Sequence, residues 1–114
     1  MSTPRPGEPV RGSTTGRALM AALDLLGRRW ALRVLWELRD GPEGFRALRA
    51  RCDDMSSSVL RQRVVELGEA GLVTQDDEQR YELTPLGADL YAALAPLNDW
   101  AGRWEATPGV RRLA

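Results

Sequence analysis

Apolar residues in this chain recur every three or four positions over five separate segments, and one strand-prone stretch interrupts that spacing. Spacing of three and four places apolar side chains on one face of an α-helix. Gly27, Gly41–Pro42 and Gly71 end three of the segments, since glycine accepts the left-handed turn after a helix and proline cannot continue one. The pattern predicts a mainly α-helical chain with a small β-hairpin, packed at 114 residues around one modest core.

The segment boundaries predict an order of four helices, a hairpin and a last helix. The helices are expected over residues 17–26, 28–40, 44–52, 56–70 and 85–106, and the hairpin over residues 72–84. Ser56 is placed to cap the fourth helix with its hydroxyl, and Thr84 and Pro85 to cap and start the last one. Pro96 lies inside the last helix and is expected to kink or divide it.

Both ends differ from the domain expected over residues 17–106. Residues 1–16 hold three of the seven prolines and three of the 11 glycines with few side chains to bury, so we expect a flexible N-terminal tail. An idle terminus is one interpretation of the tail, and contact with a partner through Arg5 and Arg11 is the other. Residues 107–114 are expected to fray.

Composition narrows the function. Cys52 is the only cysteine and histidine is absent, which excludes an intrachain disulfide and every histidine-based metal or catalytic site. Neither a distinct carboxylate pair nor a glycine-rich phosphate loop is present, so we expect no enzyme and no cofactor. No apolar run approaches the roughly 18 residues of a membrane-spanning helix, and the start lacks the apolar core of a signal peptide, which predicts a cytoplasmic protein without a membrane partner.

The formal net charge of zero hides a separation of charge along the chain. Residues 1–36 carry six arginines against two acidic residues, whereas residues 66–114 carry four arginines against nine. A chain of this kind can present a basic face to an anionic partner although its total charge is neutral.

The tight turn between the third and fourth predicted helices, followed by a hairpin, is typical of a winged helix-turn-helix, in which the later helix of the pair enters the DNA major groove. Leu60, Val64 and Leu67 form the inward stripe of the fourth helix. The outward arc carries the candidate base-reading residues, which are Ser57, Ser58, Arg61, Gln62 and Val65. Arginine can fork onto guanine, glutamine onto adenine, and valine can meet a thymine methyl. A solvated helix face is the alternative interpretation.

Arg46 and Arg49 lie on the helix expected to cross the DNA backbone, where a positive charge releases counterions without reading sequence. Ser56 and Arg80 are the further phosphate candidates. Arg80 is the only cation of a short wing tipped by three acidic residues, so most backbone contact is expected from the third and fourth helices. Arg63 borders the apolar stripe, and an internal ion pair and a DNA contact are both open for it.

Four tryptophans concentrate on the second and last predicted helices. Large rings bury much area, which favours packing in the core or in a dimer interface; an aromatic pocket for a flat ligand is the alternative. The candidate residues for the dimer interface or ligand pocket are Leu19, Leu23, Trp30, Trp36, Leu97, Trp100 and Trp104. Cys52 falls at an apolar position of the third helix, where a buried hydrophobe is the first interpretation and an oxidant sensor the second.

Three short motifs and six single residues occur in a specific order along the chain. The motifs are Leu-Gly-x-x-Trp at residues 26–30, Gly-Leu-Val at 71–73 and Leu-Thr-Pro-Leu-Gly at 83–87, and the single residues are Phe45, Leu48, Ser56, Leu60, Gln62 and Arg63. Through them, residues 22–100 resemble the HxlR-type winged-helix transcription regulators of bacteria, relatives of the MarR group. The resemblance implies a homodimer that grips a palindromic operator in double-stranded DNA, with dimer contacts from the first and last helices. Many members carry a sensing cysteine just before the first helix, where this chain has Arg17.

These patterns together predict a dimeric DNA-binding regulator, a repressor that responds to a small-molecule or stress signal, with a small aromatic compound as one candidate effector. A winged-helix module that binds a protein and not DNA is the alternative. The acidic wing and the zero net charge favour that alternative, whereas the polar face of the fourth helix and the arginines of the third favour DNA binding.

Overall fold

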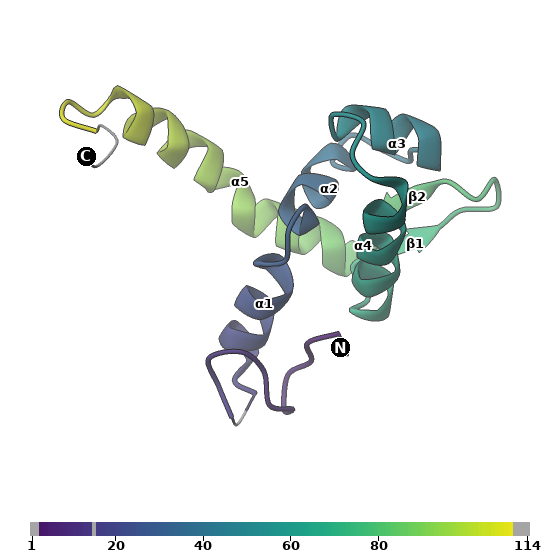
Figure 1. Ribbon diagram of the computed structural model, residues 1–114, viewed down its shortest axis with the longest axis horizontal. Helices are drawn as coiled ribbons and strands as arrows, with labels where there is room; N and C mark the ends of the chain where they lie inside the picture. The colour runs from purple at the N-terminus through teal and green to yellow at the C-terminus, as the bar shows by residue number, and fades with distance from the viewer. Residues whose placement is uncertain (1–2, 15, 111–114) are drawn as a thin grey trace.

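The computed structural model describes residues 3–14 and 16–110. Within them the elements follow the predicted order: α1 (Ala18–Leu26), α2 (Ala31–Glu37), α3 (Phe45–Arg51), α4 (Ser57–Glu69), β1 (Val73–Gln75), β2 (Tyr81–Leu83) and α5 (Pro85–Ala106) (Figure 1). β1 and β2 pair antiparallel, with Val73 opposite Leu83 and Gln75 opposite Tyr81. The arrangement confirms the winged helix-turn-helix prediction, with the hairpin as the wing beside α4.

The buried core lies between the first four helices and the hairpin. Leu60, Val64 and Leu67 are at most 4 % exposed, which confirms the predicted inward stripe of α4. They pack with buried residues from the other elements, which are Leu25, Val34, Leu35, Leu38, Leu48, Cys52, Met55, Leu72 and Val73. Each fully buried leucine contributes roughly 1.5–3 kcal/mol by leaving water. Because one side of α4 is held inward, its opposite side faces away from the domain.

α2 begins at Ala31, so the start predicted at residue 28 is wrong. Trp30 precedes the helix with φ 75°, in the left-handed region that bulky residues rarely adopt. Its side chain packs against the core, and this burial offsets the backbone strain. Hydrophobic spacing cannot reveal that one residue has a left-handed backbone. The Trp30 side chain still falls at an apolar position of the pattern, although the helix starts one residue later.

α5 begins as predicted, because the Thr84 hydroxyl accepts a hydrogen bond from the Gly87 amide at 3.0 Å and Pro85 occupies the first helical position. The helix continues through Pro96 as one element of 22 residues, so a division there is wrong, whereas the alternative of a kink stays a prediction. Pro96 removes the donor for the Ala92 carbonyl, but both residues are exposed and water can take its place. Beyond Pro96 every described residue is exposed, and this half of α5 extends away from the domain (Figure 1).

Residues 3–14 and Gly16 fold back beside α1 and the end of α4 (Figure 1). An isolated bridge joins Val10 to Ser13. The predicted flexibility of residues 1–16 stays a prediction, and residues 1, 2 and 15 lie outside the described residues. The predicted fraying of residues 107–114 also stays a prediction, since the helix ends at Ala106 and residues 111–114 are not described. Among the described helices, none has the length and apolar character needed to cross a membrane.

Candidate nucleic-acid interface

The turn between α3 and α4 presents the start of α4 to solvent. Asp53 and Asp54 adopt positive φ angles of 58° and 53°, which aspartate tolerates better than most residues. The Ser56 hydroxyl accepts a hydrogen bond from the Val59 amide at 3.4 Å, as the capping prediction requires, and lies 3.0 Å from the Ser58 hydroxyl. This turn leaves the first residues of α4 free of covering protein.

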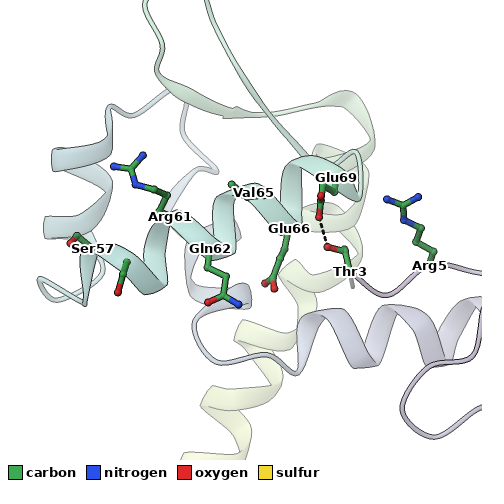
Figure 2. A pocket seen from close by; sticks show the side chains of 9 residues that line it. Thr3, Arg5, Ser57, Arg61, Gln62, Val65, Glu66 and Glu69 are labelled. Carbon is green, nitrogen blue, oxygen red and sulfur yellow. Dashed lines mark hydrogen bonds between the residues drawn. The ribbon is translucent and has the colours of Figure 1, made fainter. Parts of the chain in front are cut away.

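The candidate base-reading residues share one exposed side of α4. Ser57, Ser58, Arg61, Gln62 and Val65, which we call the reading face, are all exposed. They line an open hollow of about 680 Å³ together with Glu66, Glu69, Thr3 and Arg5 (Figure 2). Their exposure agrees with the sequence prediction, and base contact by these side chains stays a prediction.

Arg61 is held in place by an aromatic ring. Its guanidinium carbon lies 4.5 Å from the centroid of the Phe45 ring, at the start of α3. A cation over an aromatic face gains about 0.5–1 kcal/mol at an exposed site. Phe45 therefore restricts the Arg61 side chain of the reading face. The N–H groups of Arg61 lie in the plane of the guanidinium and can still donate to an acceptor.

The two arginines predicted on α3 have different surroundings. Arg46 is exposed, and among the described residues its side chain has no hydrogen-bond or ion-pair partner. Arg49 instead donates from Nε to the Met55 carbonyl at 2.6 Å and from one terminal nitrogen to the Asp54 carbonyl at 3.4 Å. Arg49 thus braces the turn before α4, a role that its spacing did not indicate, and its contact with phosphate stays a prediction.

The wing offers little positive charge. The Nε atom of Arg80 lies 2.8 Å from an Asp76 carboxylate oxygen and 3.8 Å from one of Glu78. Asp76 and Glu78 raise the pKa of Arg80, and the backbone N–H and guanidinium of Arg80 lower the pKa of Asp76. The one arginine of the wing is therefore paired within the wing, which agrees with the expectation that α3 and α4 supply most of any backbone contact.

Glu66 is a buried charged residue that the sequence interpretation missed. It is 6 % exposed, and its two oxygens lie 2.6 Å from an Arg28 nitrogen and 2.8 Å from an Arg63 nitrogen. Arg63 also donates from Nε to the Arg29 carbonyl at 2.7 Å. The internal alternative for Arg63 is the one observed, and the three side chains join α4 to the turn between α1 and α2. The spacing of Arg63 and Glu66, three residues apart on one helix, was the available signal.

The residues predicted for a dimer interface or ligand pocket fall into two groups that share Leu97, with Trp30 packed against the core. One group consists of apolar side chains on two helices that are 48–69 % exposed: Leu19 and Leu23 on α1, and Leu97, Trp100 and Trp104 on α5. The Trp100 and Trp104 rings stack at 5.5 Å between centroids. The Trp30 side chain is partly buried and packs against the core at the start of α2, and its contact with a dimer partner or a ligand stays a prediction.

Trp36 belongs to a second site between α2 and α5. Its ring lies 5.8 Å from the Tyr91 ring, and the Arg39 guanidinium lies 4.3 Å above it. Both rings line a hollow of about 350 Å³ with Leu32, Arg33, Leu35, Leu94, Leu97, Asn98 and Ala101. Arg33 is already bonded to Glu37, Asp53 and the Arg51 carbonyl, so its charge is compensated within the protein.

Cys52 is fully buried in the core, as its first interpretation predicted. Burial raises the pKa of its thiol to about 11. Since the thiolate is the reactive form, both the burial and the pKa oppose the alternative role of oxidant sensor.

Comparison with known proteins places this geometry in a family. The model of the HxlR-like helix-turn-helix family matches residues 25–108. YvaP of Bacillus subtilis strain 168, an uncharacterized HTH-type transcriptional regulator, is 30 % identical over 89 residues, or 73 % of this chain and 82 % of YvaP. Rv3095 of Mycobacterium tuberculosis strain H37Rv, described in the same words, is 32 % identical over 99 residues; the match spans 82 % of this chain but less than two thirds, 62 %, of Rv3095.

A solved structure gives the same picture. Quinone-bound YodB of Bacillus subtilis aligns with a TM-score of 0.70 and 29 % sequence identity, over 75 % of this chain and 97 % of YodB. From the family model and these relatives, the chain belongs to the HxlR-like helix-turn-helix family.

Proposed function

We propose that the chain regulates transcription as a homodimer in which two copies of α4 read the half-sites of a palindromic operator. The observation that carries this proposal is the reading face, held outward by the burial of the opposite side of α4. Repression of the genes beside the operator, released by a signal, is the mode of regulation we propose. Action on DNA would place the chain in the cytoplasm.

The test is fluorescence anisotropy of labelled DNA duplexes titrated with the full chain. One duplex comes from upstream of the chain's own gene and the other has an unrelated sequence. We expect tighter binding to the upstream duplex. Arg61→Ala should reduce the preference between the duplexes by about 1–3 kcal/mol, because bidentate base contacts discriminate by that amount. Arg46→Ala should weaken both alike and lower the salt slope by about 1 per subunit.

Arg103→Ala is the matched control, because Arg103 is an exposed arginine on the half of α5 that extends away from α4 (Figure 1). It should leave both affinities unchanged. Equal losses on the two duplexes would remove Arg61 from the base-reading residues. If the parent chain binds neither duplex, the alternative of a protein-binding module gains support.

The exposed apolar side chains of α1 and α5 support the dimer. In a monomer, the apolar side chains of Trp100 and Trp104 would be exposed to water. A dimer interface would bury them, since a stable protein interface buries about 1,200–2,000 Å² in total. We expect light scattering after size exclusion to give twice the chain mass of 12.6 kDa. The double variant Trp100→Ala/Trp104→Ala should shift toward monomer and lose operator affinity, because two linked half-sites no longer bind together. Val65→Ala, an exposed apolar residue of α4, should stay dimeric; a monomeric parent would contradict the proposal.

A small aromatic effector is the second proposal, supported by the hollow beside Trp36 and Tyr91. Its volume of about 350 Å³ is within the range of small-molecule sites, roughly 300–1,000 Å³. The compensated charge of Arg33 favours a neutral flat compound over a carboxylate. The relative YodB has been solved with a quinone bound. We expect a neutral quinone to quench tryptophan fluorescence and release the operator, with both effects reduced in Trp36→Leu; no response of either in the parent would refute this effector.

A further inference from the structure

The hollow beside the reading face has two lining residues from outside the helix-turn-helix. Thr3 and Arg5 come from the segment that precedes α1, yet they line the same hollow as Ser57 and Arg61 (Figure 2). The family match begins at residue 25, so this segment lies outside the matched residues.

A hydrogen bond anchors the segment to α4. The Thr3 hydroxyl donates to a carboxylate oxygen of Glu69, in the last turn of α4, across 66 positions of sequence. Thr3 is 6 % exposed and Pro4 is also buried. The contact therefore joins the segment firmly to the helix that carries the reading face, at the end opposite Ser57.

The segment makes this end of α4 less repulsive to an anionic partner. Glu69 would otherwise present an exposed carboxylate beside DNA, and like charges repel. Thr3 donates a hydrogen bond to that carboxylate, and Arg5 adds a positive charge to the same hollow. Arg5 is exposed, and among the described residues its side chain has no ion pair or hydrogen bond.

Two prolines limit the motion of Arg5. Pro4 and Pro6 flank it, and a proline fixes its own φ and also restricts the residue before it to extended backbone. A side chain on a restricted backbone loses less entropy when it binds. The segment thus presents one uncompensated arginine, from a nearly fixed position, next to the reading face.

We propose that residues 3–6 form a DNA-binding arm, in which Thr3 docks on Glu69 and Arg5 contacts the DNA phosphates that flank the groove read by α4. The inference rests on the proposed function. The alternative role for residues 3–6 is to cover the reading face, in which case the segment would inhibit DNA binding. The uncompensated charge of Arg5 favours contact over masking.

The experiment compares Arg5→Ala with Arg11→Ala in the anisotropy assay between 50 and 200 mM salt, using the full chain. Arg11 is an exposed arginine of the same segment that does not line the hollow. Losing one phosphate contact lowers the salt slope by about 0.9, so a dimer should lose about 1.8 and the affinity ratio of parent to Arg5→Ala should shrink about twelvefold over this range. The loss should be the same on upstream and unrelated duplexes, and Arg11→Ala should behave as the parent.

Thr3→Val tests the anchor, because valine matches the shape of threonine without its hydroxyl. It should lower affinity in the same direction as Arg5→Ala, while Arg61→Ala alone changes sequence preference. The arm is overturned if Arg5→Ala keeps the salt slope of the parent, or if either arm variant binds DNA more tightly. In those cases normal binding by the parent and altered preference in Arg61→Ala would leave the proposed function intact; a parent that binds no DNA would overturn both.

Discussion

Replacing Glu66 with alanine should destabilise the fold far more than a typical substitution on a helix. The change leaves Arg28 and Arg63 facing each other's charge without the carboxylate between them. Removing one partner of a buried ion pair costs about 3–5 kcal/mol. Both arginine side chains are 14 % exposed, so water partly reaches them and we expect about 3 kcal/mol, the lower end of that range. A small domain has about 5–15 kcal/mol in total, so the loss is large.

Urea unfolding followed by far-UV circular dichroism measures this loss, at one fixed chain concentration because dimerisation adds to the stability. Gln62→Ala is the matched control, since Gln62 is an exposed residue of the same helix and its removal should cost within about 0.5 kcal/mol. Glu66→Gln keeps one acceptor oxygen, replaces the other with an NH2 donor and removes the charge, so its stability should fall between the two. If Glu66→Ala unfolds at the same urea concentration as Gln62→Ala, the reasoning about the buried charges is refuted.

Three further predictions follow from single positions. Gly87→Ala should cost about 1–3 kcal/mol in urea unfolding, because a Cβ there would lie 2.1 Å from the Leu72 carbonyl oxygen; unchanged stability would contradict that clash. Burial raises the pKa of the Cys52 thiol to about 11 in the folded chain, so the folded state holds this proton more tightly than the unfolded state. Stability on the order of 2 kcal/mol should therefore be lost as the pH rises from 9 to 11 in the parent, but not in Cys52→Ala. Asp76 has a lowered pKa, so its pairing with Arg80 should contribute at neutral pH and vanish as acid titrates the carboxyl; in Asp76→Asn the amide exchange of the wing should be faster at pH 7 and match the parent in acid.

The order of elements and the orientation of α4 were determined by the sequence itself. Periodic apolar residues such as Leu60 and Leu67, and capping residues such as Ser56 and Thr84, act over three or four positions of the chain. Both signals favour a helix over the same residues, so they could be interpreted without the tertiary structure. The reading face could be predicted for the same reason, because an inward stripe leaves only one side of the helix outward.

Tertiary structure alone decided which polar groups meet. Glu66 pairs with Arg28 across 38 positions, Thr3 reaches Glu69 across 66, and Arg49 turns back to the Met55 carbonyl instead of facing solvent. The left-handed backbone of Trp30 belongs with these, since the core offsets its strain. Long flexible side chains have many low-energy positions in an isolated segment. The partner that a charged group finds depends on how the helices pack, and no local pattern contains that information.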